Sequence, residues 1–175
     1  VVGLGRMGRI VVDRVLDAGH DVVAFDIDEE SVAAAADAGA EPADSIPDLA
    51  KRLGDDKRIW LMVPAGDAVD AALEELEPHL GGDDIVVDGG NSHFEDSVRR
   101  AESTDAAYLD CGTSGGPAGA DLGFSLMVGG PEAAYEELTP VFDAVATGPA
   151  GHDRMGAAGS GHYVKMVHNG VEYAL

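Results

Sequence analysis

Lys165, Asn169 and Glu172 combine side chains and spacing that suit acid–base chemistry. If this segment is helical, their separations place an amine, an amide and a carboxylate on one face. Such a pair of ionisable groups can take up one proton and return another. The same spacing also suits a solvated helix face with a Lys/Glu pair. Gly170 favours a site, because an interior helix glycine costs about 1 kcal/mol relative to alanine and therefore indicates close approach of a ligand or another backbone.

The element that must carry these groups is a helix predicted over residues 159–175. A helix is also a more rigid platform for such groups than a loop. His162 and His168 flank the polar stripe, and Tyr173 follows it. The apolar side chains beside the polar stripe form a second stripe suited to packing, namely Val164, Val167 and Val171.

The opening segment has the spacing G-x-G-x-x-G. Gly3 permits a tight turn, Gly5 lets a pyrophosphate approach the backbone, and Gly8 lets helix and strand pack closely. The helix that follows, to about residue 18, offers backbone N–H groups and a positive dipole end to phosphates. A purely structural glycine turn would have the same spacing. The predicted cofactor-binding residues here are Gly3, Leu4, Gly5, Arg6, Met7 and Gly8.

Asp26 ends a predicted strand over residues 21–26 and lies 18 residues after Gly8. A carboxylate at this place binds the adenosine ribose hydroxyls of a dinucleotide. Ile27 and Asp28 follow, with no basic residue nearby to accept a 2′-phosphate, so both are included in the predicted cofactor site. The sequence therefore predicts NAD rather than NADP. A solvated aspartate at a strand end is the alternative.

Strand and helix patterns alternate along the chain, which predicts an α/β fold with a doubly wound parallel sheet of the Rossmann-like type. Strands are predicted at 21–26, 57–63, 84–88, 107–111, 124–128 and 145–147. Helices are predicted at 30–38, 67–79, 94–103 and 131–144, with Pro131 at the first helical position of the last one. A further short helix is predicted to end at about residue 53. The segment 148–160 is interpreted as a glycine-rich link.

Three further segments follow predicted strands, at the sheet edge where such folds bind ligands. Val63, Pro64 and Ala65 could line the cofactor. Asn91 could reach both cofactor and substrate, or could simply form a turn. Residues 112–120 offer free backbone N–H groups for a carboxylate or phosphate, unless they form a flexible linker. Within this loop the candidate substrate residues are Ser114, Gly115 and Gly116.

Composition narrows the classes of partner. The chain has 175 residues, 33 of them acidic and 11 basic, and a net charge of −22. This charge argues against nucleic acid and anionic membranes as partners. At about 1 M salt the Debye length is only about 3 Å, so the repulsion between these acidic side chains would be screened. A surface as acidic as this one therefore predicts a high-salt host. The single cysteine, Cys111, is predicted to be a buried thiol in a reduced, cytoplasmic protein.

Other polar residues are interpreted as structural. Arg99 and Arg100 are predicted to neutralise the surface at a helix end, and His152 is predicted to be solvated. The histidines have no metal-ligand spacing with Cys111, so no metal site is predicted. The sequence begins at a short apolar run and stops within the last predicted helix, which predicts a longer protein.

These motifs together resemble 6-phosphogluconate dehydrogenases, the decarboxylating enzymes of the pentose phosphate pathway. The resemblance extends through the chain and is carried by GLGRMG at 3–8, MVPAG at 62–66, DGGNS at 88–92, GTSGGPAGA at 112–120, SLMVGG at 125–130 and HYVKMVHNGVEY at 162–173. It implies NAD-linked oxidation and decarboxylation of 6-phosphogluconate to ribulose 5-phosphate and CO₂, by a homodimer or homotetramer.

The resemblance also implies residue roles. Lys165 would be the general base and Glu172 the general acid, with no metal required. Asn91 would touch both ligands. The sugar acid would be bound by Ser114, Gly115, Gly116, His168, Asn169 and Tyr173.

Two departures from the family pattern carry information. Members that use NADP have Asn-Arg-Ser/Thr in place of Asp26-Ile27-Asp28, which supports NAD. The large all-helical C-terminal domain of the family is absent. The implied division is a cofactor domain at 1–158 and the beginning of the catalytic helix at 159–175, leading into that helical domain.

Two rival interpretations remain open. A β-hydroxyacid dehydrogenase of the 3-hydroxyisobutyrate type shares the glycine fingerprint, the SGG loop and a catalytic lysine. The His168-Asn169 pair, Glu172 and the DGGNS segment favour the sugar acid instead. A non-catalytic NAD-sensing module is the second rival, and intact Lys165 and Glu172 argue against it.

Overall fold

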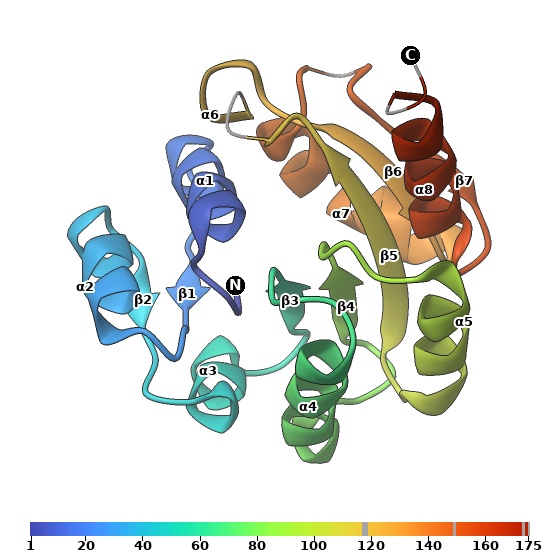
Figure 1. The fold of residues 1–175 in the computed structure, drawn as a ribbon. Coiled ribbons are helices and arrows are strands. Elements are labelled where there is room, and N and C mark those ends of the chain that lie inside the picture. Colours follow the sequence, from blue (N-terminus) through green and yellow to red (C-terminus); the bar gives the residue numbers. More distant parts are fainter. Residues whose placement is uncertain (117–118, 149, 173, 175) are drawn as a thin grey trace.

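A computed structural model describes residues 1–116, 119–148, 150–172 and 174. A twisted sheet with helices on both faces organises these residues (Figure 1). The strands are β1 (Val23–Ala24), β2 (Glu41–Pro42), β3 (Arg58–Leu61), β4 (Ile85–Asp88), β5 (Ala107–Ser114), β6 (Ser125–Gly129) and β7 (His152–Gly156). The helices are α1 (Arg6–Asp17), α2 (Glu29–Asp37), α3 (Ile46–Leu53), α4 (Asp67–Leu76), the 3₁₀ turn η1 (Glu77–His79), α5 (Phe94–Ser103), α6 (Gly119–Leu122), α7 (Glu132–Val145) and α8 (Ser160–Glu172).

The strand order confirms the predicted α/β class. β3, β4 and β5 pair in parallel, and β1 pairs in parallel with β2. Val2 joins these two groups through parallel bridges to Phe25 and Leu61. The carboxyl ends of the parallel strands therefore meet at one edge, close to the start of α1 (Figure 1).

The sheet changes direction at β6, which pairs antiparallel with β5 and parallel with β7. The connection between β5 and β6 is only ten residues long, and its described part, 115–116 and 119–124, contains the short helix α6. A parallel return requires a crossover of about a dozen or more residues. The predicted parallel arrangement thus holds for the strands that carry the candidate cofactor segments. The β6–β7 pair runs in the opposite direction.

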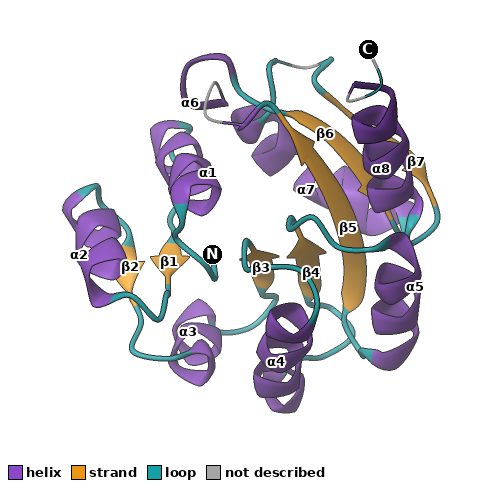
Figure 2. Cartoon of the chain, in the orientation of Figure 1, coloured by secondary structure: helices purple, strands orange, loops and turns teal. Residues whose placement is uncertain are grey.

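Several boundaries differ from the prediction. Gly112–Ser114 continue β5, although a loop was predicted there, because they pair with Ser125–Met127 of β6. Residues 152–156 form β7 instead of a link (Figure 2). β7 has a polar sequence and alternates between half-buried and exposed positions, so it lacks the apolar run that would reveal a strand.

The region around α7 differs as well. Pro131 is the N-cap of α7, one position before the predicted one. Val145 ends that helix, and Ala146 forms only an isolated bridge to Phe124, so the strand predicted at 145–147 is wrong. The side chain of His152 is only 5% exposed and lies 2.9 Å from the Tyr135 hydroxyl, which corrects its predicted solvation.

Alternation of side chains along the strands gives each face of the sheet its own core. On one face Trp60, Val87 and Leu109 pack with residues of α1 and α7. On the other, Ile59 and Val86 pack with residues of α3 and α4. Figure 1 shows α4, α5 and α8 on the near side and α7 on the far side. Among the described residues, no helix combines the length and apolar character needed to cross a membrane.

Candidate active site

Helix α8 begins on a buried carboxylate, that of Asp110 in β5. This side chain has no exposed surface. One of its oxygens accepts the Gly159 backbone N–H at 2.6 Å, and the other accepts that of His162 at 2.7 Å. A carboxylate at this end is also favoured by the positive pole of the helix dipole. Asp110 therefore fixes the start of the helix that carries the predicted acid–base residues.

Two glycines let α8 approach the sheet closely. A Cβ atom on Gly112 of β5 would lie 2.5 Å from the Cβ of Lys165, and one on Gly161 would lie 2.3 Å from the Met127 carbonyl oxygen. Real Cβ atoms essentially never approach so closely. The stem of Lys165 therefore packs on β5 because residue 112 has no side chain.

The predicted polar face of α8 is present. Lys165 and Asn169 are half-buried, whereas His168 and Glu172 are exposed. Burial lowers the pKa of the Lys165 ammonium below its ordinary value, and the negative charge of Glu172 opposes this shift. The His168 Nδ1 lies 3.7 Å from a Glu172 carboxylate oxygen. A larger neutral fraction of Lys165 at a given pH is what a general base requires.

The glycine fingerprint folds as predicted. Gly3 has φ +92°, and a Cβ there would lie 2.6 Å from the Met62 carbonyl oxygen. A Cβ on Gly8 would collide with the Gly3 carbonyl oxygen, so only glycine permits this packing of helix on strand. Gly5 instead faces open space in the described part of the chain and is the N-cap of α1, with no side chain there capping the helix. The first turn of α1 can therefore receive an anion.

Asp26 lies beside the fingerprint. One carboxylate oxygen accepts the Leu4 N–H at 2.5 Å, and the other accepts the Asp28 N–H at 2.9 Å. Asp28 itself is the N-cap of α2 and accepts the Ser31 N–H. Ile27 between them is 95% exposed. Asp26 thus links the fingerprint turn to the start of α2 and keeps acceptor capacity toward solvent.

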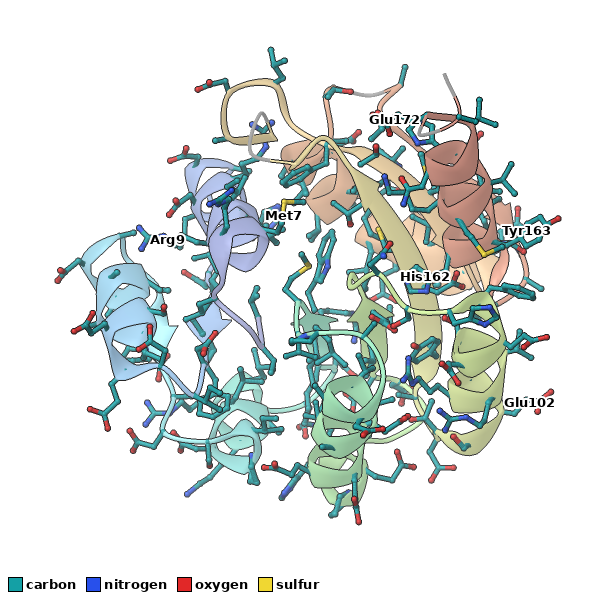
Figure 3. The ribbon with its side chains drawn as sticks, viewed as in Figure 1. Met7, Arg9, Glu102, His162, Tyr163 and Glu172 are labelled. Carbon is teal, nitrogen blue, oxygen red and sulfur yellow. The ribbon has the colours of Figure 1, made fainter. Side chains whose placement is uncertain are left out.

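A cleft of about 780 Å³ opens over these segments. It brings together most of the predicted cofactor residues: Gly3, Gly5, Arg6, Met7, Gly8, Asp26, Ile27, Val63, Pro64 and Asn91. Met7 lies on the side of α1 that faces the central strands (Figure 3). Of the other predicted cofactor residues, Leu4 is buried in the core, Asp28 caps α2, and Ala65 is exposed in the turn before α4.

Of the predicted substrate residues, Asn91 lines this cleft, whereas Ser114, Gly115, Gly116, His168 and Asn169 are not part of its described lining. Ser114 is half-buried at the end of β5, and Gly115 and Gly116 follow with φ +137° and +52°. Thr113, which sequence reasoning did not select, lines the cleft immediately before them. Tyr173 lies outside the described residues. β5 therefore runs from the cofactor cleft to the candidate substrate loop.

His162 is a second residue whose place the sequence did not reveal. It is 2% exposed, at the end of α8 nearest α5 (Figure 3). Its Nδ1 lies 2.8 Å from the Ser97 hydroxyl, and its Nε2 lies 3.1 Å from the Gly90 carbonyl oxygen. Because that carbonyl can only accept, Nε2 carries a proton. His162 thus connects the helix of Lys165 with the turn that precedes Asn91.

Acidic residues inside apolar strands were the available signals for this region. Asp110 and Asp88 each occur within or at the end of a strand that is otherwise apolar, and both are fully buried. Buried charges are paired or hydrogen-bonded, so such residues indicate polar contacts made inside the fold. Cys111 is buried as predicted, and burial raises the pKa of its thiol to about 12. Within the described ranges, no group of His, Cys, Asp and Glu is arranged to hold a metal ion.

We expect Gly112→Ala to lower kcat at least about 100-fold, since a displacement of a reacting group by about 1 Å can have that effect. The added methyl group would push the stem of Lys165 away from β5. Gly170→Ala is the matched control. Gly170 has open space around it in the described part of the chain, so no described backbone makes the predicted close approach, and approach of a ligand there stays a prediction. Steady-state kinetics of both variants check this, and equal activities would contradict the packing argument.

Comparisons with known proteins agree with this geometry. The profile of the family described as the NAD binding domain of 6-phosphogluconate dehydrogenase matches residues 1–162. A Haloferax volcanii protein named 6-phosphogluconate dehydrogenase, NAD(+)-dependent, decarboxylating, is 83% identical over the whole chain, which covers 58% of that protein. A putative 6-phosphogluconate dehydrogenase of Bacillus subtilis is 39% identical, again over the whole chain and 59% of the relative. The chain thus spans somewhat less than two thirds of these relatives.

Solved structures share the fold. A Plasmodium falciparum 6-phosphogluconate dehydrogenase aligns with a TM-score of 0.86 and 31% identity, over 98% of this chain and 39% of that one. A Mycobacterium tuberculosis 3-hydroxyisobutyrate dehydrogenase aligns with a TM-score of 0.88 and 28% identity, over 98% and 58%. The fold alone therefore does not separate the sugar-acid enzyme from its predicted rival.

Proposed function

The chain belongs to the family of the NAD-binding domain of 6-phosphogluconate dehydrogenase, and from this premise we propose that its protein oxidises and decarboxylates 6-phosphogluconate with NAD. The products would be ribulose 5-phosphate, CO₂ and NADH. The observation that supports this most directly is the placement of Lys165. It is half-buried on a helix fixed to β5, and burial lowers the pKa of its ammonium.

The residues of the chain divide the proton transfers between them. Neutral Lys165 takes the proton of the C3 hydroxyl as the alcohol is oxidised. The charged ammonium then polarises the new carbonyl while C1 is lost as CO₂. Glu172 protonates the enediol carbon that remains, which completes the sugar phosphate. His168 and Asn169, on the same helix, are proposed to bind the substrate together with Ser114–Gly116 and Tyr173.

The cleft has the features that a dinucleotide requires. Gly5 leaves open space at the start of α1, whose N–H groups are proposed to bind the pyrophosphate. Asp26 is proposed to accept hydrogen bonds from the adenosine ribose. Val63, Pro64 and Asn91 would lie along the nicotinamide half. When bound, the cofactor supplies the acceptor for the hydride from C3.

Asp26→Asn is expected to reduce the preference for NAD over NADP by about 10- to 100-fold, since hydrogen bonds to charged groups contribute about 1.5–3 kcal/mol. The amide retains an oxygen for the Leu4 N–H, which supports the fingerprint turn, and its NH₂ group would face the Asp28 N–H, which is exposed and can bond to water instead. The lost negative charge would no longer repel a 2′-phosphate. The ratio of kcat/KM for the two cofactors measures the effect, and a ratio equal to that of the wild type would refute the assignment of Asp26.

The test of the reaction is CO₂ release and NADH formation by the full-length protein with 6-phosphogluconate in molar KCl. NAD and NADP are supplied in parallel. NADH with stoichiometric CO₂ supports the proposal and excludes a non-catalytic sensing module. NADH from 3-hydroxyisobutyrate, with none from 6-phosphogluconate, would assign the protein to the rival class of dehydrogenase.

We also propose a cellular setting from the charge. A net charge of −22 and 83% identity with a relative from Haloferax volcanii support a cytoplasmic enzyme adapted to high salt. Its partners would be small molecules and further copies of itself, as a dimer or tetramer, rather than nucleic acid or anionic membranes. Residues 1–158 would form the cofactor domain and residues 159–175 the first part of the catalytic helix. Retention of fold and solubility after dialysis to low salt would oppose the high-salt setting.

A further inference from the structure

Arg100 of α5 is a buried cation that the reaction does not use. Only 1% of its side chain is exposed, so its predicted role in neutralising the surface is wrong. The neighbouring Arg99 is 55% exposed and does fit that role. The sequence could not separate the two, because adjacent residues of a helix point in different directions and the side that is covered depends on the packing of the helix.

The guanidinium of Arg100 joins two turns that lie far apart in sequence. One amino group donates at 3.1 Å to the carbonyl oxygen of Gly66, which is the last residue of the Val63–Gly66 turn before α4. The other donates to the Ser92 hydroxyl at 3.1 Å and to the Asp88 carboxylate at 3.3 Å. Nε contacts Asp70 of α4 at 2.9 Å. The Arg100 side chain therefore contacts both the turn that ends at Gly66 and the turn that contains Ser92.

Asp88 transmits this anchoring to the turn before Asn91. Its carboxylate is fully buried and accepts the Ser92 hydroxyl at 2.7 Å and the Gly90 N–H at 3.1 Å. The Tyr108 hydroxyl donates to the same carboxylate at 2.9 Å. The Asp88–Ser92 turn is thus closed around a carboxylate whose charge Arg100 balances.

The two turns meet at the cofactor cleft. A Cβ on Gly90 would lie 3.1 Å from the Val63 carbonyl oxygen, so their backbones are in contact. Val63, Pro64 and Asn91 line the cleft. Arg100 is not among the described residues that line the cleft, so it contacts these turns from behind the cleft wall.

We propose that Arg100 is a positioning residue that holds Asn91 in register with the Val63–Gly66 turn, so that both turns meet the nicotinamide half of the cofactor and the adjoining substrate. This inference rests on the proposed function for the identity of the ligands. Arginine is suited to this task because its planar fork donates in several fixed directions at once. A lysine ammonium carries the same charge but is a single compact centre, which cannot reach Gly66, Ser92 and Asp70 together.

The experiment compares Arg100→Lys with Arg99→Lys in the full-length protein. Both substitutions keep the charge, they are adjacent in α5, and both arginines pair with Asp70. We expect Arg100→Lys to raise the dissociation constant for NAD and to lower kcat/KM for 6-phosphogluconate, by about 10- to 100-fold in the latter, as displacement of positioned groups does. Arg99→Lys should leave both unchanged.

Amide hydrogen exchange gives a readout that does not depend on turnover. Arg100→Lys should accelerate exchange at Gly89 and Gly90, whose N–H groups are bonded in the first turn, and at Val69 and Asp70, whose N–H groups donate to the Gly66 carbonyl oxygen at the end of the second. Exchange in the β4 and β5 strands should stay slow. All measurements are made well below the thermal midpoint of each variant. Unchanged exchange in the two turns, with unchanged NAD binding, would overturn the proposal. Uniform acceleration over the whole domain would also overturn it, because the residue would then act only on global stability.

Ser92→Ala covers the case in which Arg100→Lys does not fold. It removes one donor–acceptor group between Arg100 and Asp88 without removing a charge. A smaller effect of the same sign on exchange and on NAD binding supports the proposal. The absence of any effect on either measurement overturns it. The proposed function fails separately: a wild-type protein that binds NAD but does not oxidise 6-phosphogluconate rejects the reaction, while exchange and NAD binding still test Arg100.

Discussion

Lys165→Met is expected to lower kcat for oxidation of 6-phosphogluconate by about 10³-fold or more, near the upper part of the range for loss of a general base. Methionine is unbranched and of similar length, so it can retain the packing on Gly112 of β5. What it removes is the amine that takes the hydroxyl proton and then polarises the carbonyl. The measurement is kcat under saturating cofactor and substrate.

NAD binding is the internal control for this variant. The cleft of about 780 Å³ is lined by described residues among which Lys165 does not occur. The dissociation constant for NAD should therefore remain close to that of the wild type when measured by calorimetry. Activity near the wild-type level would exclude Lys165 as the base, whereas joint loss of NAD binding and activity would indicate that the substitution disturbs α8.

The pH dependence of kcat/KM gives an independent test of Lys165. Only the neutral amine can accept a proton, so the rate should rise with pH through the pKa of this group and then level off. Because burial lowers that pKa, the plateau should be reached at a lower pH than an exposed lysine would give. In Glu172→Gln the opposing charge is absent, so the inflection should move lower still. An inflection that moves upward would contradict this electrostatic assignment.

Asp110→Asn is expected to reduce the free energy of unfolding by about 2–4 kcal/mol, the scale of losing a buried, charge-assisted hydrogen bond and leaving its partner unpaired. The buried carboxylate accepts two backbone N–H groups at the start of α8. An amide of the same shape has only one acceptor oxygen, and its NH₂ group faces the second N–H. Chemical denaturation in molar KCl measures the loss.

Asp105→Asn is the matched control for Asp110. Asp105 is exposed just before the same strand, and only its backbone N–H has a described contact, with Glu77. Its substitution should leave the unfolding free energy unchanged within about 0.5 kcal/mol. Asp110 also fixes the start of the helix that carries Lys165. The kcat of Asp110→Asn should therefore be lower than that of the wild type even at temperatures where the variant is still folded. Equal unfolding free energies of the two variants would show that the Asp110 carboxylate does not stabilise the start of α8.

The sequence by itself determined the alternation of strands and helices that defines the α/β class, and it indicated the candidate ligand segments. Local patterns suffice for this, because apolar periodicity and turn residues act over a few positions. Helix α5 has the predicted bounds, and the glycines at 3 and 8 have the structural roles that their spacing indicates, while the role of Gly5 toward a pyrophosphate stays a prediction. Candidate cofactor segments could be grouped without coordinates, since parallel strands end at the same sheet edge.

Only the tertiary structure decided which polar residues are buried and what they hold. Arg100 and His162 resemble surface residues in the sequence, yet each is almost fully buried against partners distant along the chain. The polar edge strand β7 and the reversal at β6 likewise depend on pairing between segments rather than on local propensity. Burial of a charge is settled by whether distant groups can satisfy it, which is a property of the folded chain and not of any short stretch.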